Sequence, residues 1–245
     1  MELKVIGSGS KGNCYVLESE SGEMLIIEAG VKIDQVKKFL DFDLSNVSGV
    51  IVSHSHGDHS KAMEGFAKSA INVYAGAETI KEMNLKSHRL KPIEAKKRYT
   101  IGSFKVVPLK LRHDVFCLGF VIQHEECGNV VFLTDTFYSP FKFKNIHNWI
   151  IEANYSESIM DGKDGYGSEN KYLRNRVLSS HLSFENCLDM LDVNDLTQTN
   201  NVVLTHLSDR NSHAKQFKEA TERQTGKSVY VAETGLSIPF NKKPF

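Results

Sequence analysis

The chain has 245 residues, 40% of them hydrophobic, which is enough to bury a substantial core. Lysine plus arginine and aspartate plus glutamate number 30 each, so no net field draws the molecule to nucleic acid or an anionic membrane, and any phosphate contact must be local. With no membrane-length apolar run, no cleavable leader pattern and four isolated cysteines, we expect a cytoplasmic chain that forms one domain over residues 1–245.

The first part of the chain predicts an antiparallel meander. Short apolar runs at 3–6, 14–17 and 24–27 are separated by turns rich in glycine and serine. Apolar residues at helical spacing then predict a helix over 31–42, and a β-branched run predicts a buried strand over 47–53. Beyond it we expect a helix over 61–69, a strand over 71–74 and a further helix that starts near residue 77.

The rest of the chain first predicts strands and then alternates helices with strands. Alternating or wholly apolar runs at 104–111, 116–123, 130–134 and 149–153 are typical of strands, followed by helix 184–191, strand 202–205, helix 212–223 and strand 229–232. This order favours an α/β fold in which two mixed sheets pack face to face with helices outside, a four-layer αββα sandwich. The glycine-rich segment 161–168 is expected to be a surface loop.

Four metal-ligand side chains lie close together directly after the predicted strand over 47–53. The segment reads S-H-S-H-G-D-H-S and contains His54, His56, Asp58 and His59. On extended backbone His54 and His56 can point at one position, while Asp58 and His59, beyond the glycine turn, can point at a second position nearby. Ligands bind at the C-terminal ends of strands in open α/β sheets. The segment therefore predicts a site for two metal ions.

Three more candidate ligands each follow an apolar strand. His113 ends the run 106–112, Asp135 ends 130–134 and His206 ends 202–205. A single histidine in such a place is more often a packed or hydrogen-bonded residue than a ligand. Because all three occupy equivalent places, we expect them to complete the metal site.

This pattern resembles the metallo-β-lactamase superfamily, whose members share the αββα fold. The resemblance spans nearly the whole chain and implies two zinc ions, with manganese or iron as alternatives. It assigns the first ion to His54, His56 and His113, the second ion to Asp58, His59 and His206, and a bridging role to Asp135. Di-iron relatives usually carry glutamate in place of His56, so this histidine disfavours iron. Relatives usually carry aspartate in place of Glu28, so the sequence leaves open whether the longer side chain changes the support of the ligands, while the ligands themselves match.

Two further segments are similar to paired motifs of tRNase Z-type enzymes. In these motifs Glu152, at the end of a strand, orients His181, which protonates the departing oxygen while a metal-bridging hydroxide attacks. The resemblance thus implies that Asp58, Glu152 and His181 are catalytic and that Glu152 raises the pKa of His181. The alternative is that Glu152 caps its strand and His181 caps the helix that begins near Ser183.

In length and motifs the chain most resembles the YycJ-like branch of this superfamily, which is regarded as DNA exonucleases. This implies a phosphodiesterase whose partner is nucleic acid, DNA rather than RNA, with no membrane or protein partner inferred. Arg174 and Arg210 are candidate substrate-binding residues, with Lys171 and Arg176 nearby, although basic residues are often only solvated. The aromatic segment 137–143 could stack bases or close the core.

Two other hypotheses stay open from the sequence alone. Small thioesters or lactones could be hydrolysed with the same metal ions and without a proton donor such as His181. In a non-catalytic binding module, the metal ions would only brace the fold.

Overall fold

The computed structural model describes residues 1–161 and 171–243 and contains two seven-stranded sheets. In the first sheet β1, β2 and β3 form the predicted antiparallel meander, β14 pairs antiparallel with β1, and β4, β5 and β6 continue in parallel from β3. In sheet order its strands are β14 (Ser237–Pro239), β1 (Glu2–Gly7), β2 (Cys14–Glu18), β3 (Met24–Ile27), β4 (Val47–Ile51), β5 (Val73–Ala75) and β6 (Leu90–Pro92).

The second sheet is also mixed. Strands β7 to β10 are antiparallel neighbours, whereas β11, β12 and β13 continue in parallel from β10. Its strands are β7 (Tyr99–Ile101), β8 (Phe104–Leu111), β9 (Cys117–His124), β10 (Gly128–Leu133), β11 (Asn148–Glu152), β12 (Asn201–Thr205) and β13 (Ser228–Val231). The two mixed sheets confirm the αββα prediction.

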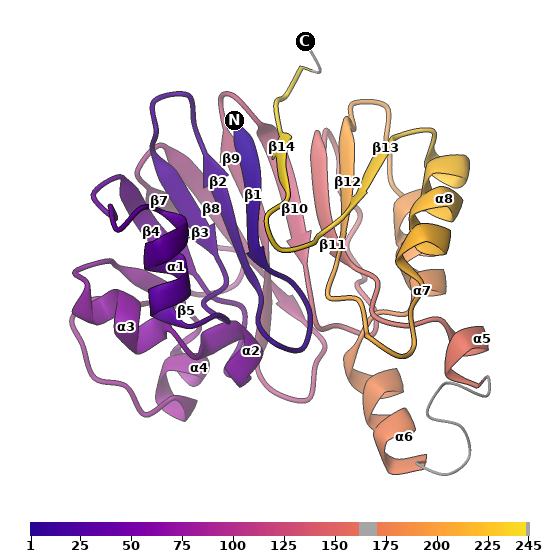
Figure 1. The fold of residues 1–245 in the computed structure, drawn as a ribbon, viewed down its shortest axis with the longest axis horizontal. Helices are drawn as coiled ribbons and strands as arrows, with labels where there is room; N and C mark the ends of the chain where they lie inside the picture. Colours follow the sequence, from indigo (N-terminus) through magenta and orange to yellow (C-terminus); the bar gives the residue numbers. More distant parts are fainter. Residues whose placement is uncertain (162–170, 244–245) are drawn as a thin grey trace.

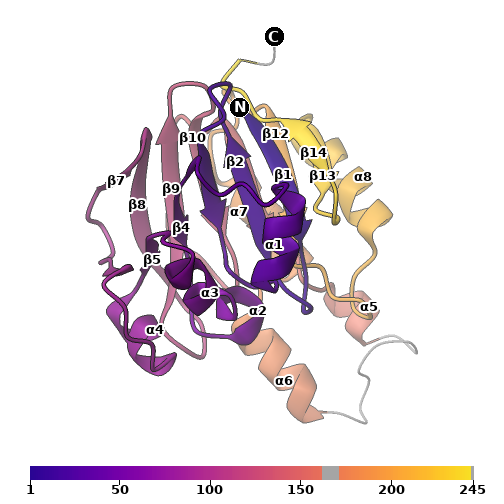
Figure 2. The same ribbon diagram turned by 60° about the vertical axis from the view of Figure 1, so that its left-hand side comes forward.

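Helices cover the outer faces of the paired sheets (Figures 1 and 2). Beside the first sheet lie α1 (Ile33–Phe39), α2 (Gly57–Ser60), α3 (Met63–Lys68) and α4 (Ala77–Glu82), and beside the second lie α5 (Glu157–Met160), α6 (Lys171–Ser180), α7 (Phe184–Asp192) and α8 (Ala214–Thr225). Among the described residues, no helix combines the length and apolar content needed to cross a membrane.

Side chains along each strand point alternately to the two faces of its sheet, and this alternation produces three hydrophobic layers. Side chains such as Leu25, Phe104 and Phe132 fill the space between the sheets. The opposite faces of the strands bury a second cluster beneath α1 and α3, and a third, around Trp149, beneath α7 and α8. This is the arrangement that a face-to-face pair of sheets requires, since each sheet then has two buried faces over much of its area.

Some boundaries differ from the sequence-based expectations. The helix expected over 31–42 is confined to α1, and the histidine-rich segment itself forms α2, ahead of the α3 helix that was expected from residue 61. The three-residue strands β6, β7 and β14 were not predicted. Except for Asp161, the predicted loop over 161–168 lies outside the described residues.

The directions of the strands place the candidate site. In the second sheet, β8 and β10 both run antiparallel to β9, while β11 and β12 run parallel to β10, so all four end at the same edge. The chain carries His113, Asp135, Glu152 and His206 at or just after these four ends. The segment after β4 brings the histidine-rich motif of the first sheet to the same end of the sandwich.

Candidate metal centre and catalytic site

Asp135 lies at the centre of the candidate site, with one carboxylate oxygen facing each of two groups of ligands. Its Oδ2 lies 3.6 Å from Nε2 of His54 and 3.8 Å from Nε2 of His113. Its Oδ1 lies 3.4 Å from Nε2 of His59 and 2.8 Å from Nδ1 of His206. The side chain is buried, and the backbone φ of 44° holds it in the left-handed region. This is the arrangement that a bridging carboxylate needs.

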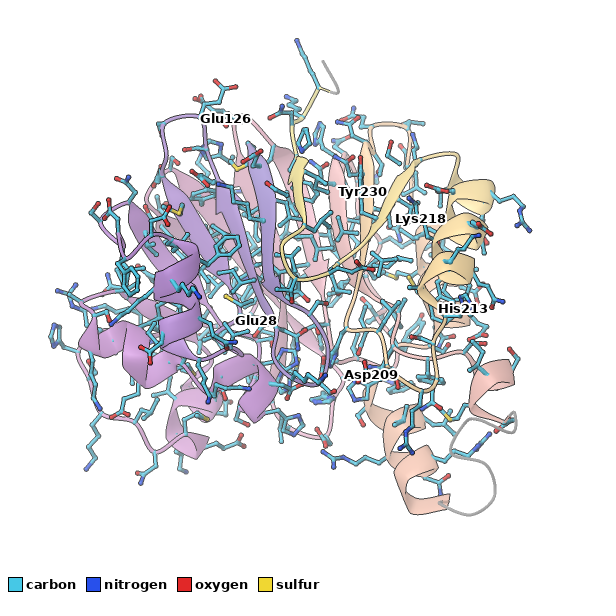
Figure 3. All side chains as sticks on the ribbon, in the orientation of Figure 1. Glu28, Glu126, Asp209, His213, Lys218 and Tyr230 are labelled. Atoms are coloured by element: carbon cyan, nitrogen blue, oxygen red, sulfur yellow. The ribbon has the colours of Figure 1, made fainter. Side chains whose placement is uncertain are left out.

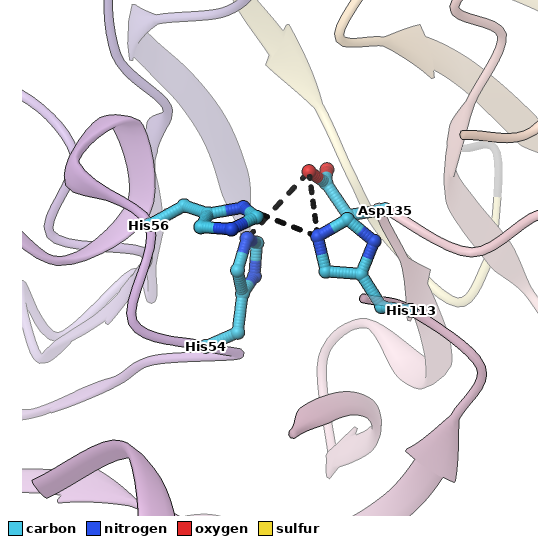
Figure 4. Close-up of side chains that lie close together, drawn as sticks. All are labelled: His54, His56, His113 and Asp135. Atoms are coloured by element: carbon cyan, nitrogen blue, oxygen red, sulfur yellow. Dashed lines mark hydrogen bonds and ion pairs between the residues drawn. The ribbon is translucent and has the colours of Figure 1, made fainter. Parts of the chain in front are cut away.

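The first group comprises His54, His56, His113 and Asp135. One ligand atom from each residue lies within 4.8 Å of the others, and Nδ1 of His56 is 3.2 Å from Nε2 of His113. Figure 4 shows the three imidazoles and the carboxylate converging on one position. Because these residues come from the ends of β4, β8 and β10, the group joins the two sheets.

The second group comprises Asp58, His59 and His206. A third cluster of Asp135, Glu152, His181 and His206 shares one residue with each of the two groups. Oδ2 of Asp58 lies 3.5 Å from Nε2 of His59 and 3.4 Å from Nε2 of His206. His59 and His206 are buried, whereas Asp58 is partly exposed at the wall of a cavity. The seven residues expected to bind metal are thus brought together in two adjacent groups.

Hydrogen-bond partners on the outer side orient the imidazoles of the first group. Nδ1 of His113 donates to the backbone carbonyl of Ser180 at 2.9 Å, which leaves Nε2 as the ring's lone-pair nitrogen. Nδ1 of His54 lies 2.8 Å from the Ser53 hydroxyl, and Nε2 of His56 lies 3.4 Å from the Asp114 carboxylate. In His54 and His113 the nitrogen that faces the group is therefore opposite the nitrogen with an outer partner, as in metal sites. The Asp114 carboxylate instead lies beside the group, because its Oδ1 is also 3.0 Å from Nε2 of His113.

The first group fits a metal ion for a second reason. Nε2 of His54 is buried and has no hydrogen-bond partner among the described residues, which is costly unless a further ligand is bound. Burial also lowers the pKa of His54 well below its ordinary value, so the ring is neutral and offers a lone pair. Imidazole and carboxylate donors suit zinc and other first-row divalent ions. The two groups are consistent with a dinuclear metal site.

Several carboxylates surround the two imidazoles of the second group. Burial lowers the pKa of His59, but the nearby carboxylates of Asp135 and Glu28 outweigh it and raise this pKa to about 10. The pKa of His206 is likewise raised, because Asp135, Asp58 and Glu152 outweigh its burial. Without metal, both rings therefore favour the charged form with a proton on each nitrogen. A bound cation would displace one of these protons from each ring.

Two buried residues contact the imidazole of His59 in the second group, Glu28 at Nδ1 and Asn13 at the nitrogen that also faces Asp58 and Asp135. Oε2 of Glu28 lies 3.3 Å from Nδ1 of His59, so the longer side chain still reaches the imidazole. Glu28, which directly follows β3, is labelled in Figure 3. The Asn13 amide lies 3.1 Å from Nε2 of His59, and its backbone N–H donates to the Asp58 carbonyl at 2.8 Å. Sequence reasoning missed the role of Asn13. The signal was the glycine- and serine-rich loop that precedes it, which packs against α2.

Glu152 and His181 also meet beside the metal ligands. Oε1 of Glu152 lies 2.7 Å from Nδ1 of His181 and 3.0 Å from Nδ1 of His206. Its Oε2 accepts from the backbone N–H of Leu182 at 3.0 Å, so the buried carboxylate is fixed on both sides. Burial lowers the pKa of His181, but Glu152 outweighs it and raises this pKa above the ordinary value. This favours a protonated imidazole.

A cavity of about 480 Å³ opens over both groups of ligands. Asp58, His181 and Arg210 line it, together with Arg176 on α6. Arg174 does not line it, because its guanidinium pairs with Asp161 at 2.9 Å. Of the two arginines expected to bind substrate, the structure thus brings only Arg210 to the site, and Arg176 occupies the place expected for Arg174.

Comparison with known proteins agrees with this architecture. An αββα sandwich with paired His/Asp clusters between the sheets defines a metal-dependent hydrolase. The model of the metallo-beta-lactamase superfamily matches residues 7–147, and the chain belongs to this superfamily.

Relatives of several kinds share the fold. The chain is 25% identical to "Exodeoxyribonuclease YycJ" of Bacillus anthracis over 228 residues, 85% of this chain and 83% of the relative. The metallo-beta-lactamase fold protein YhfI of Bacillus subtilis superposes with a TM-score of 0.72 at 17% identity, covering 97% of this chain and 98% of that one. The short form of human tRNase Z superposes with a TM-score of 0.62 at 17% identity, covering 97% of this chain and 98% of that one. The two structural matches show the fold.

Proposed function

We propose that this protein is a dinuclear zinc phosphodiesterase that acts on nucleic acid, as a DNA exonuclease. The observation that carries the proposal is the contact between Glu152 and His181 at the wall of the cavity that holds the ligand groups. The similarity to a protein named as an exodeoxyribonuclease over 85% of the chain supports DNA as the substrate. Zinc fits a donor set of five imidazoles and two carboxylates without thiolate.

We assign the first ion to His54, His56 and His113 and the second to Asp58, His59 and His206, with Asp135 between them. When bound, such a pair of ions supplies an activated water nucleophile at neutral pH and neutralises charge on the phosphoryl oxygens. Asp58 is also assigned a catalytic role, because its carboxylate lines the cavity next to the reacting atoms.

The residues of the chain supply the proton for the leaving group. Glu152 fixes Nδ1 of His181 at 2.7 Å, so the other ring nitrogen, Nε2, is available to the cavity. Since Glu152 keeps the ring protonated, Nε2 can donate a proton to the departing sugar oxygen as the bond to phosphorus breaks. An alkoxide expelled without a proton is a poor leaving group, and a positioned acid contributes about 10²–10⁴-fold. Arg210 and Arg176 are placed to hold flanking phosphates.

The test compares His181→Ala with the wild type on two substrates that differ in their leaving group. On end-labelled DNA we expect kcat to fall by about 10²–10⁴-fold, because the sugar alkoxide needs a proton. On bis(p-nitrophenyl) phosphate we expect a much smaller loss, because p-nitrophenolate leaves readily without one. Metal content, measured by mass spectrometry, should be unchanged.

His213→Ala is the matched control, since His213 caps α8 through a bond from the Gln216 N–H and takes no part in the site. Equal losses on both substrates, or full activity on DNA, would remove the proton-donor role of His181. Turnover of S-lactoylglutathione or an acyl lactone without any cleavage of DNA or RNA would instead favour a thioester or lactone hydrolase. End-labelled RNA in the same assay decides between the two nucleic acids.

A further inference from the structure

The outer face of β8 and β9 carries polar residues at the end far from the metal centre. Phe104 and Ile122 point into the core between the sheets, so Lys105 and Gln123 point outward, and both are exposed. The residues at the start of β8 and the end of β9 lie opposite the strand ends that lead to His113 and the cavity. This part of the sheet is therefore a surface distinct from the catalytic site.

Two adjoining hollows mark this surface, with volumes of about 360 Å³ and about 470 Å³. Lys105, Gln123 and Asn129 line both hollows, so the two are continuous. One carboxylate, that of Glu125, is present in the lining. Five cationic side chains line the hollows, and we call them the basic track: Arg98, Lys105, Lys142, Lys144 and Lys242.

The cations of the basic track form no ion pair within the described part of the chain. Elsewhere on the surface Lys68, Lys97 and Arg174 each pair with a carboxylate. None of the five members of the basic track forms such an ion pair, and all five are exposed. In a chain with 30 acidic and 30 basic residues, this local excess of positive charge fits a polyanion.

A segment of the chain connects the basic track to the metal centre. Because β10 and β11 are parallel, the connection that begins after Asp135 must return along the sheet to its far end. It exposes 37% of Phe137 and 51% of Tyr138 near the site. A hollow of about 180 Å³ between Tyr138 and Lys142 also contacts Leu182, the neighbour of His181. Lys142 lines both this hollow and the next, so these depressions adjoin one another, and Asp189 is the carboxylate in the lining of the smaller one. The chain from Asp135, which lines the catalytic cavity, to Tyr138 leads from that cavity to this hollow.

We propose that the basic track binds the phosphate backbone of a DNA strand whose end lies in the catalytic cavity. This inference rests on the proposed function and adds an extended binding surface to it. Phosphates contact Lys and Arg along such paths without sequence preference, and exposed aromatic side chains stack unpaired bases. Phe137 and Tyr138 would serve this second purpose between the cavity and the basic track.

The length of the path from the cavity to the basic track determines how many nucleotides a DNA strand needs in order to contact both. β8 has eight residues, which at about 3.3 Å per residue span about 26 Å. A stacked strand rises about 3.4 Å per nucleotide, so about eight nucleotides reach from the cavity to the far hollow. Shorter substrates would be hydrolysed without contact to Lys105.

The experiment uses the full chain with zinc and the double variant Lys105→Glu/Lys144→Glu. We expect KM for a single-stranded probe of about 24 nucleotides to rise at least about 10-fold, and its salt dependence to weaken by about 0.7 in slope per lost contact. KM for a probe of about four nucleotides, which is too short to reach the track, and turnover of bis(p-nitrophenyl) phosphate should stay unchanged. The control Lys38→Glu/Lys81→Glu makes the same charge change at two exposed lysines without an ion pair among the described residues, on α1 and α4 over the opposite sheet, and should affect neither probe.

Binding gives a readout that does not depend on catalysis. In the His181→Ala background, fluorescence anisotropy should show tight binding of the long probe and at least about 10-fold weaker binding after charge reversal. Unchanged binding of the long probe, or equal weakening for short and long probes, would overturn the proposal. The neutral pair Lys105→Gln/Lys144→Gln should show the same trend if charge reversal alters folding. A wild type that binds the long probe but cleaves no phosphodiester would refute the proposed function and leave the basic track supported.

Discussion

At the residue scale, the site depends on side chains that bind no metal. Asn13 is buried, accepts a hydrogen bond from the Gly9 N–H at 2.9 Å, and places its amide 3.1 Å from Nε2 of His59. It also holds the Asp58 carbonyl through its backbone. The loop before β2 thus supports the second ligand group, although no residue of that loop has an obvious metal-binding side chain.

We expect Asn13→Ala to destabilise the protein by about 2 kcal/mol, because it leaves buried partners of the amide without hydrogen bonds. It should also weaken metal binding by about 10-fold, because the amide donates to the Asp58 carbonyl at 3.3 Å and helps to hold the segment that carries Asp58 and His59. Thermal unfolding and metal titration measure the two effects. Asn175→Ala, at an exposed position on α6, is the control, and an equal effect there would argue against a special role for Asn13.

Much of this residue-level detail could be predicted. Each expected metal ligand directly follows a strand or lies in one short motif, so residue type and position sufficed to predict that these side chains gather at one end of the sandwich. Arg174 and Arg176 could not be distinguished in the same way, because their roles depend on which helix face meets Asp161. Asn13 was missed because its function arises from packing between segments 45 residues apart.

At the element scale, the position of α2 depends on a close approach by backbone. A Cβ atom at Gly30 would lie 1.6 Å from the carbonyl oxygen of Asp58, and one at Gly12 would lie 2.1 Å from the carbonyl oxygen of Gly30. Three backbone segments are therefore stacked without room for a side chain. This stack holds the ligand-bearing motif against the end of β3.

Two glycine variants test that stack. Gly30→Ala should displace α2, destabilise the fold by about 3 kcal/mol and reduce bound metal, since main chain must move to relieve the clash. Gly57→Ala should retain wild-type metal content and melting temperature, because no atom lies within 4 Å of the added methyl group, although Gly57 belongs to the metal motif itself. Equal behaviour of the two variants would contradict this account.

The elements that escaped prediction are the short ones. β6, β7 and β14 have three residues each, too few for a period to be recognised. β14 also owes its existence to pairing with β1 at the other end of the sequence, as in Leu3 opposite Ile238. Longer strands such as β8 matched the expected range because their alternation is local.

At the scale of the whole molecule, one carboxylate joins the two sheets at the end opposite the metal centre. Glu23, just before β3, accepts hydrogen bonds from the Ser48 hydroxyl of β4 at 2.5 Å and from the Ser103 N–H of the second sheet at 2.9 Å. Burial raises the pKa of Glu23, but the bonds from Ser103 and Ser48 outweigh it and lower this pKa below its ordinary value of 4.5.

The lowered pKa gives a defined pH dependence. A group whose pKa is lower in the folded state stabilises above its unfolded pKa and loses this effect as pH falls through the folded pKa. We therefore expect Glu23→Gln to cost about 1 kcal/mol at pH 7, a value limited by solvent exposure, and less at about pH 3. Urea unfolding of both proteins at the two pH values measures the difference. A constant difference would show that charge is not involved.

The metal centre links the sheets at the other end. His54, His56, Asp58 and His59 come from the first sheet, and the remaining ligands come from the second. We expect a chelator to lower the melting temperature, with a loss of about 4 kcal/mol for free metal at about 1,000 times its dissociation constant. Calorimetry with and without chelator measures this. In the His54→Ala/Asp58→Ala double variant, the chelator should change the melting temperature far less.

Because the ligands come from both sheets, metal binding and sheet packing should also follow a fixed order during folding. Neither sheet alone presents more than four of the seven donors, so an intermediate with one formed sheet would hold an ion only loosely. The chain can therefore bind the ion tightly only after the two sheets have packed together. The moment at which a refolding chain stops releasing metal ions to a fluorescent indicator would then time the docking of its two halves.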